Sequence, residues 1–410
     1  MAKEEKTAVV PRLRFPDFHG AWEYKSLASF LEECGSRVPA ITSLPIYSSS
    51  RSGLTPQSSY YDGRTIINDG EYGTVPPNCF VYRHMSDDGQ FVFNLNETGG
   101  EIAVSKEYPV FQTVNLDRYF LLAKLNHSQD FKAFALSQKA GGTRTRLYFS
   151  KLRSWETYLP SLAEQQKIAN CLSSLDELIA AQRRKVEALK TYKRGLMQQL
   201  FPREGETRPR LRFPEFQNSG VWVVRTIGDM FQLINGCAFK PEDWKPSGTP
   251  IIRIQNLNDS SADFNYSQAP VPEKNRVEPG DLLFAWSGTV GSSFGARVWN
   301  GPSGVLNQHI FKVLMDEQQI TLLFSLVVLS RVEEDIAKQT HGFKASFVHV
   351  KKSDLVKVGL LLPSLPEQQR IAACLTSLDA QITAEIQELE VLKTHKKGLM
   401  QQLFPSLDEA

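Results

Sequence analysis

One long stretch of this chain occurs twice. Residues 159–202 and residues 362–405 are identical at 29 of 44 aligned positions, without a gap and at a constant offset of 203 residues. A shorter repeat precedes each half, because Pro11-Arg-Leu-Arg-Phe-Pro-Asp-Phe18 returns as Pro209-Arg-Leu-Arg-Phe-Pro-Glu-Phe216. The segments of about 140 residues between these repeats show no obvious similarity to each other. Repeats of this kind indicate duplicated structural units. We therefore expect one element that occurs twice and two different globular domains, which we call head one (15–158) and head two (207–361).

Each copy of the long repeat has the pattern of a coiled-coil helix. Its seam residues recur with a strict spacing of 4, 3, 4, 3, which places them on one side of a helix. A long helix cannot bury such a stripe alone, so we expect the two copies to pack on each other in antiparallel orientation, related by a pseudo-twofold axis. The seam positions are Ile168, Leu172, Leu175, Ile179, Gln182, Val186, Leu189, Lys193, Leu196 and Leu200 in the first copy, and Ile371, Leu375, Leu378, Ile382, Glu385, Leu389, Leu392, Lys396, Leu399 and Leu403 in the second.

The same signals mark the ends of both helices. Ser161-x-x-Glu164 and Ser364-x-x-Glu367 have the spacing of a capping box at a helix start, and a proline at 202 and at 405 stops each helix. Both copies end in Gly-Leu-Met-Gln-Gln-Leu-Phe-Pro, which is more identity than a helix seam requires. We interpret it as a duplicated surface for a duplicated partner. The alternative is that both helices are spacers without a binding role.

Composition limits the class of protein. A chain of 410 residues with 41% hydrophobic and 22% charged residues is typical of two globular units with connectors. No apolar run reaches the ~18 residues that cross a membrane, and the N-terminal sequence lacks the apolar core of a signal peptide. The odd number of cysteines, none in a Cys-x-x-Cys pair, argues against a disulfide framework or a zinc ribbon, so we expect a cytoplasmic protein. The cysteines are Cys34, Cys79, Cys171, Cys237 and Cys374.

Together these motifs closely resemble the specificity (S) subunit of type I restriction–modification systems. The resemblance is carried by LPSLAEQQKIA at 159–169 and LPSLPEQQRIA at 362–372, each preceding a seam helix with its LMQQLFP end. Four further features are also similar to that family: the short Pro-Arg-Leu-Arg-Phe-Pro repeats, Gly236-Cys-Ala-Phe-Lys240, Ile251-Ile-Arg-Ile-Gln-Asn256 and the segment 280–288. The resemblance implies two target-recognition domains that each read half of an asymmetric bipartite DNA site. It also implies two conserved helical regions that bind two methyltransferase subunits and, through them, restriction subunits.

The expected fold is of the mixed α+β class, with two globular heads separated by two long antiparallel helices. Runs at 280–285 and 306–314 alternate like strands, whereas 317–339 and 115–138 read as helices within the heads. The expected domains are an N-terminal arm at 1–14, target-recognition domain 1 at 15–158, a central helical region at 159–206, target-recognition domain 2 at 207–361 and a C-terminal helical region at 362–410.

Candidate DNA-binding residues in head one are arginines in polar or glycine-rich contexts, because arginine suits both phosphates and base edges. The preferred segment is Gly141-Gly-Thr-Arg-Thr-Arg146, where two glycines free the backbone. Head one has no G-x-A-F-K motif, and we expect it to belong to a different subclass of head. The alternative for each residue is a solvated surface cation. The head-one candidates are Arg51, Arg64, Arg83, Arg144 and Arg146.

Candidate DNA-binding residues in head two lie in corresponding contexts. His341-Gly-Phe-Lys-Ala-Ser346 stands at the same place before the second long helix as the glycine-rich segment of head one stands before the first. Trp244, Trp286 and Trp299 are expected in the core rather than against bases. The head-two candidates are Lys240, Arg253 and Lys344.

Enzymatic motifs are missing from the sequence. It contains no G-x-x-x-x-G-K-[ST] phosphate loop, no N-P-P-Y/F or D-P-P-Y/F tetrapeptide of amino-methyltransferases, and no metal-ligand spacing. We therefore expect a noncatalytic subunit that binds no metal, with S-adenosylmethionine, ATP and Mg²⁺ in partner subunits. The alternative function is a helical scaffold or inhibitory relative whose heads bind protein rather than DNA.

Overall fold

The computed structural model describes residues 9–61, 70–139, 144–289, 292–339 and 347–405. The chain divides into two compact units, one made of residues 1–184 and 386–410 and the other of residues 185–385. Each unit therefore holds one head together with part of each long helix.

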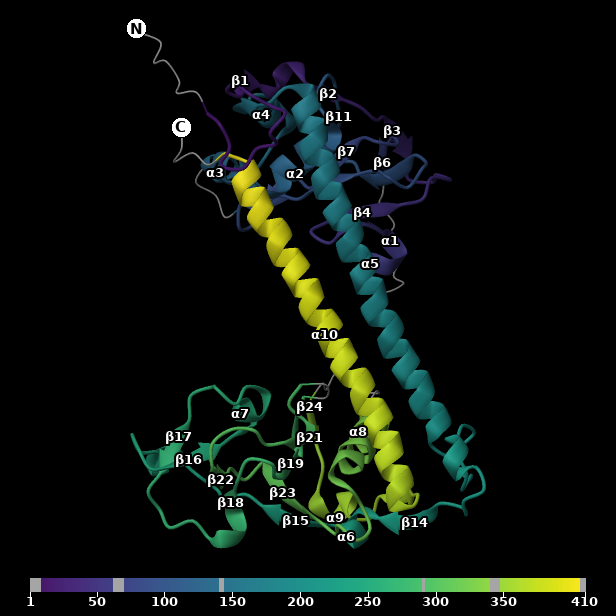
Figure 1. Ribbon diagram of the computed structural model, residues 1–410. Helices are drawn as coiled ribbons and strands as arrows, with labels where there is room; N and C mark the ends of the chain where they lie inside the picture. The colour runs from purple at the N-terminus through teal and green to yellow at the C-terminus, as the bar shows by residue number, and fades with distance from the viewer. Residues whose placement is uncertain (1–8, 62–69, 140–143, 290–291, 340–346, 406–410) are drawn as a thin grey trace. The chain divides into compact units, whose positions relative to one another are not determined.

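Both repeats form long, unbroken helices, drawn in teal and yellow in Figure 1. Helix α5 spans Leu162–Leu200 and helix α10 spans Leu365–Leu403, 39 residues each. Each ends two residues before the proline expected to stop it. All of the predicted seam positions are buried or half-buried.

The two helices run antiparallel within each unit. In the first unit, Leu172 near the start of α5 shares a cluster with Leu403 at the end of α10, and further along Asp176 pairs with Lys396. In the second unit, Leu375 shares a cluster with Leu200, and Asp379 pairs with Lys193. The polar seam residues Lys193 and Lys396 thus find carboxylates on the opposite helix.

Head one is built on a four-stranded antiparallel sheet of order β2-β11-β7-β9, with a three-stranded sheet β10-β6-β3 and the ribbons β1–β13, β4–β5 and β8–β12. Its strands are β1 Glu23–Ser26, β2 Leu31–Glu33, β3 Arg37–Pro39, β4 Tyr47–Ser50, β5 Gly53–Pro56, β6 Glu71–Val75, β7 Phe80–Tyr82, β8 Met85–Ser86, β9 Phe93–Leu95, β10 Ile102–Ser105, β11 Val110–Thr113, β12 Thr145–Arg146 and β13 Glu156–Leu159. Its helices are η1 Leu27–Ser29, α1 Gln57–Tyr60, α2 Arg118–His127, α3 Gln129–Ser137 and α4 Phe149–Arg153.

Head two is built on the sheet β15-β23-β19-β21, with a second sheet β17-β16-β22-β18 and the ribbons β14–β25 and β20–β24. Its strands are β14 Val223–Thr226, β15 Phe231–Asn235, β16 Thr249–Ile252, β17 Asn265–Ser267, β18 Arg276–Val277, β19 Leu282–Ala285, β20 Ser287–Thr289, β21 Gly295–Val298, β22 Gly304–Leu306, β23 Ile310–Met315, β24 Phe347–His349 and β25 Gly359–Leu362. Its helices are η2 Pro214–Phe216, α6 Ile227–Met230, η3 Pro241–Asp243, α7 Ile254–Asn258, η4 Glu273–Asn275, α8 Leu322–Gln339 and α9 Lys352–Leu355.

The two heads share one topology that their sequences conceal. Strands β2, β11, β7 and β9 correspond in order and direction to β15, β23, β19 and β21. The second sheets agree as well. Val75 pairs with Ile102 in head one, and Val277 pairs with Gly304 in head two, so each residue of the head-two pair lies 202 positions after its counterpart in head one. The two heads, whose sequences show no obvious similarity, therefore share one fold. Strands pair through their backbones, so this topology survives extensive replacement of side chains.

One of the two inner strands of each main sheet, β7 or β19, is buried on both faces. Alternate residues of β19 belong to different clusters, because Phe284 packs with α8 residues while Leu283 packs with the second sheet. In head one, Tyr82 and Val81 of β7 divide in the same way. Strand side chains point alternately to opposite faces, so a continuous apolar run is needed at this position.

Several sequence expectations require correction. The expected strand 306–314 is interrupted, because the chain passes from β22 in one sheet to β23 in the other. The expected helix 317–339 begins only at Leu322, after a turn from Asp316 to Ile320. The expected helix 115–138 is two helices, since Ser128 ends α2 and caps α3 through its hydroxyl.

The sequence expectation was against a disulfide framework, and the fold brings one pair of cysteines together. The sulfur atoms of Cys34 and Cys79, which are 45 residues apart in the sequence, lie side by side in head one. Folding brings the end of β2 beside the start of β7, a proximity that cysteine spacing in the sequence does not reveal. Cys171, Cys237 and Cys374 are free.

Candidate nucleic-acid interface

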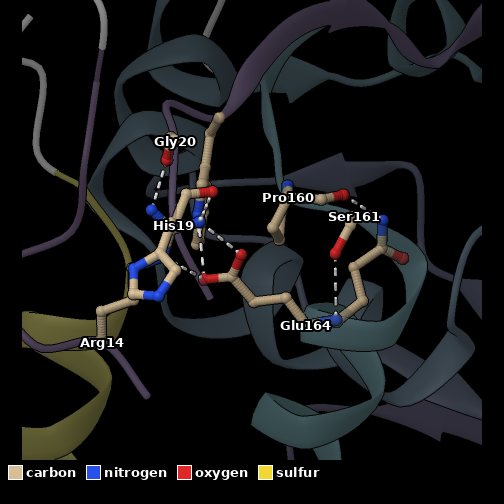
Figure 2. A network of polar contacts seen from close by, with 8 residues as sticks. Arg14, His19, Gly20, Pro160, Ser161 and Glu164 are labelled. Atoms are coloured by element: carbon tan, nitrogen blue, oxygen red, sulfur yellow. Dashed lines mark hydrogen bonds and ion pairs between the residues drawn. The ribbon is translucent and has the colours of Figure 1, made fainter. Parts of the chain in front are cut away.

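The N-terminal arm is fastened to the start of α5 through Arg14 (Figure 2). The Arg14 guanidinium donates from Nε to Oε1 of Glu164 at 2.8 Å and from Nη2 to Oε2 at 2.7 Å. It also donates to the carbonyl oxygens of His19 and Gly20. The Glu164 side chain is only 1% exposed, and the Trp22 indole N–H donates to the same carboxylate at 3.3 Å. A two-point, charge-assisted pair of this kind fixes geometry as well as charge.

The predicted capping box at the start of α5 is only half formed. The backbone N–H of Glu164 donates to Oγ of Ser161 at 3.3 Å, as expected. The Glu164 carboxylate, however, turns to Arg14 rather than back to the helix start (Figure 2). The nearby guanidinium offers a stronger partner than a neutral backbone N–H.

The second unit repeats this contact. Arg212 donates from Nε and Nη2 to the two oxygens of Glu367 at 2.7 and 2.6 Å, and from Nη1 to the carbonyl oxygens of Ser219 and Gly220 at 2.8 and 3.0 Å. Glu367 is 1% exposed. We refer to the pairs Arg14–Glu164 and Arg212–Glu367 as the two arm clamps.

The glutamine after each clamp glutamate ties the long helix to its head. Gln165 donates to the carbonyl oxygen of Pro160 at 2.9 Å and accepts the backbone N–H of Asp117, the N-cap of α2, at 2.9 Å. Gln368 accepts the N–H of Thr321, directly before α8, at 3.1 Å. The repeated Glu-Gln pair is thus occupied within the chain.

The repeated Leu-Phe-Pro ends are also internal. Phe404 after α10 packs on Phe120 of head one, with ring centroids 5.6 Å apart. Phe201 after α5 packs on Trp222 and Phe324 in the second unit at 5.6 and 5.8 Å. These contacts explain why the chain repeats more than a helix seam.

Head one gathers two candidate arginines around a pair of aspartates. Arg51 follows β4 and donates to Oδ1 of Asp88, while Nε of Arg144 donates to Oδ1 of Asp87 at 2.8 Å. The Arg51 guanidinium, helped by the Ser86 hydroxyl, lowers the pKa of Asp88. Both ion pairs are exposed and contribute little to stability, so the arginines can exchange an aspartate for a phosphate.

The other head-one candidates lie apart from this pair. Arg146 is exposed on β12, which pairs with β8. Arg83 is exposed directly after β7, and its charge acts on Tyr108, a phenol whose pKa is raised by burial. Arg64 lies outside the described residues.

In head two, Arg253 is held by an aromatic ring and an amide. Its Nη1 donates to Oδ1 of Asn265 at 2.7 Å, and its guanidinium lies 5.1 Å from the ring centroid of Trp244. Lys240 is exposed, with Nζ 3.7 Å from Oε1 of Glu242. Lys344 lies outside the described residues.

The expectation of three core tryptophans in head two holds only in part. Trp299 is buried, but Trp244 and Trp286 are half-buried. Gly236, at the start of the predicted Gly-x-Ala-Phe-Lys motif, has a structural role. A Cβ there would stand 2.0 Å from the carbonyl oxygen of Asn307.

Arg51 and Arg253 each follow a strand, but they do not lie at equivalent positions of the fold. Strand β4 continues from Ile46, which bridges in parallel to Ala103, and β16 pairs in parallel through Ile251 with Val305. Each strand then pairs antiparallel with the strand after it, β5 or β17. Arg51 directly follows β4 and Arg253 directly follows β16. Arg51 lies five residues after Ile46, in the turn of the β4–β5 hairpin, whereas Arg253 lies two residues after Ile251 and caps α7.

Asp87 and Asp88 were missed by sequence reasoning. Their only signal was an acidic pair directly after a strand, and such pairs are usually solvated turns. Among the residues that the structure describes, no group of three or more His, Cys, Asp or Glu side chains could hold a metal ion. Within the same residues, no helix has the length and apolar character to cross a membrane.

The comparisons with known proteins agree with these features. The family model for the type I restriction modification DNA specificity domain matches residues 89–191 and 220–394, together more than half of the chain. A Methanocaldococcus jannaschii protein, described provisionally as the MjaX type I restriction enzyme specificity subunit, is 26% identical over 340 residues, covering 76% of each chain.

Two solved structures share the fold. The type I restriction-modification S subunit from M. genitalium matches with a TM-score of 0.58 and 16% identity, covering 97% of this chain and 100% of its own. A chain from a structure on complex assembly and conformational transition of the type I system matches with a TM-score of 0.56 and 17% identity, covering 94% and 98%.

The chain belongs to the family of type I restriction–modification DNA specificity subunits. The family model is that of a DNA specificity domain, and the relative from M. jannaschii is named as a specificity subunit.

Proposed function

We propose that this chain is the DNA-recognition subunit of a type I restriction–modification complex, with each head reading one half of an asymmetric bipartite site. The observation that carries the proposal is one head topology occurring twice with different side chains, such as Arg51 with its aspartate in head one and Arg253 with its tryptophan in head two. Equal folds allow both heads to approach DNA in the same way. Because the two heads carry different side chains, they recognise different base sequences in the two half-sites.

The cationic candidates are proposed to contact DNA. Arginine and lysine neutralise phosphates, and arginine can also read guanine from the major groove. Because such contacts release counterions, affinity should fall steeply with salt. The proposed DNA-contacting residues are Arg51, Arg64, Arg83, Arg144, Arg146, Lys240, Arg253 and Lys344.

The long helices are proposed to bind two methyltransferase subunits, which in turn bind restriction subunits. The seam residues are buried inside the chain, so the partner surface has to use exposed residues that are identical in both copies. Gln166 with Gln369 and Ala181 with Ala384 meet both conditions. Two copies of such a surface fit two copies of one partner.

We further propose that the functional boundaries are an arm at 1–14, target-recognition domains at 15–158 and 207–361, and helical regions at 159–206 and 362–410. The compact units, which change at residues 184/185 and 385/386, cut each long helix within its length. S-adenosylmethionine, ATP and Mg²⁺ belong to partner subunits in this proposal, and the complex acts in the cytoplasm.

The proposal is tested by purifying the chain with the methyltransferase subunit of the same system and sequencing exposed DNA with detection of methylated bases. We expect one asymmetric split motif, methylated only when this chain is present. Replacing residues 207–361 with head two of a relative should change one half-site only, and the unaltered chain is the control. A change in both half-sites contradicts modular reading. A complex that methylates no motif supports protein-binding heads instead.

A further inference from the structure

The ribbons β8–β12 and β20–β24 occupy the same place in the two heads. Each begins directly after the inner strand β7 or β19 of the main sheet, and each is closed by one backbone bond. The N–H of Leu147 donates to the carbonyl oxygen of His84 at 2.8 Å, and the N–H of Val350 donates to that of Trp286 at 3.0 Å. Each is followed by a short helix, α4 or α9.

The pairing register identifies Arg146 and His349 as equivalent residues. Arg146 lies opposite Met85, and His349 lies opposite Ser287. The offset between the heads is therefore 203 residues from Arg146 to His349 and 202 residues from Met85 to Ser287. Both Arg146 and His349 are exposed, whereas the preceding residue of each strand, Thr145 or Val348, is buried. Each ribbon thus turns one polar side chain outward from the same point of the fold.

His349 is held in place by an aromatic neighbour. Its ring meets Trp286 edge-on, with centroids 4.6 Å apart and planes at 79°. The Trp286 indole N–H donates to the carbonyl oxygen of Gln308 at 3.1 Å, and the Gln308 amide lies 3.2 Å from Nε2 of His309. In head one, His84, the counterpart of Trp286, stacks on Tyr148. A ring fixed in this way presents hydrogen-bonding nitrogens with little loss of side-chain entropy.

We propose that these two ribbons are the base-reading elements of the heads, and that His349 is the specificity-determining counterpart of Arg146. The major groove of B-DNA admits a two-stranded ribbon and distinguishes all four base pairs by their donors and acceptors. Arg146 supplies donors alone, whereas a histidine ring supplies a donor and an acceptor. Different bases are therefore read from one position. This inference rests on the proposed DNA-recognition function.

The test uses the full chain in complex with its methyltransferase subunit. In His349→Ala, methylated-motif sequencing should show a loss of discrimination of about 10-fold or more at one base pair of the half-site read by head two, with the other half-site unchanged. Arg146→Ala should cause the same loss of discrimination at one base pair of the half-site read by head one, with the head-two half-site unchanged. His395→Ala, an exposed histidine of α10, is the matched control and should leave the motif intact. His349→Arg should shift the base preferred at that position.

The outcomes separate this inference from the function on which it rests. A motif unchanged in His349→Ala and Arg146→Ala overturns the ribbon assignment and leaves DNA recognition standing. Methylation reduced equally at all base pairs also overturns it, because that is the effect of a lost phosphate contact. No methylated motif with the unaltered chain refutes the proposed function itself.

Discussion

At the residue scale, the arm clamps explain why the glutamate of the Glu-Gln-Gln motif is repeated. Glu164 and Glu367 are buried carboxylates that each bind an arginine of the preceding arm at two points. A buried charge without its partner is strongly unfavourable, because desolvation is no longer offset. The glutamate of the motif is therefore required for the internal structure of each unit.

Removing one clamp arginine should destabilise the second unit. We expect Arg212→Ala to lower the free energy of unfolding by about 3–5 kcal/mol, since Glu367 is left buried and unpaired. The measurement is guanidinium chloride unfolding of the full chain. Arg210→Ala, an exposed arginine two residues away in the same arm, is the control and should change stability by less than about 0.5 kcal/mol. Equal effects of the two substitutions would show that the clamp is not needed.

Glu333 of α8 is a half-buried carboxyl with an unusual environment. Burial raises its pKa from 4.5 to about 7, although the N–H of Ala296 donates to it at 2.7 Å. Gly295 makes room for it, because a Cβ there would stand 1.9 Å from the carboxylate. The folded state therefore binds the Glu333 proton more tightly than the unfolded state. Its contribution to stability is complete below pH 4.5 and is lost as the pH rises through about 7.

Glu333→Gln should remove part of the pH dependence of stability. We expect the melting temperature of the unaltered chain to fall between pH 5 and pH 8, and that of the variant to fall less over the same range. Thermal unfolding at several pH values measures this difference. Glu317→Gln, an exposed glutamate before α8, should keep the original slope. A variant with the same slope as the unaltered chain would rule out Glu333 as the titrating group.

At the element scale, each long helix is held at both ends by a head. The helix start is tied by its clamp and glutamine, and the helix end inserts a phenylalanine into a head core. The arm also closes the helix end, because the N–H of Leu13 donates to Gln402 and that of Leu211 donates to Gln199, each at 3.0 Å. These carbonyl oxygens belong to the last turn, which has no partners within the helix.

Truncating one inserted phenylalanine should loosen a single unit. Phe201 is 4% exposed, and we expect Phe201→Ala to cost about 3–5 kcal/mol through the cavity it leaves. Hydrogen exchange should show reduced protection in β15 and β23, while β7 and β11 keep theirs. The exposed Gln198→Ala serves as the control. Uniform loss of protection in both units would contradict this local role.

At the scale of the whole molecule, the sequence predicted the helices far better than the heads. The ends of α5 and α10 follow from proline stops, and their buried side follows from the 4, 3, 4, 3 spacing, because both signals are local. The head strands are mostly 2 to 5 residues long and pair with distant strands. Their shared topology depends on backbone contacts that leave little pattern in the side chains.

The candidate site was predictable by residue type but not by arrangement. Arg51 and Arg253 were chosen as arginines in polar contexts, and only the structure shows that Arg51 lies beside Asp88 and Arg253 beside Trp244. His349 was not a candidate, because a histidine between apolar residues carries no distinctive signal. That Arg64 and Lys344 contact DNA stays a prediction.

The docking of Phe404 in head one has a consequence for synthesis of the chain. Residues 185–385 form a continuous segment and contain every part of the second unit, whereas the first unit needs both its own head and residues beyond 385. Domains of nascent chains usually fold in order from the N-terminus. Here the core of the first-made head cannot close until Phe404 has left the ribosome, so the later-made unit can be completed before the earlier one.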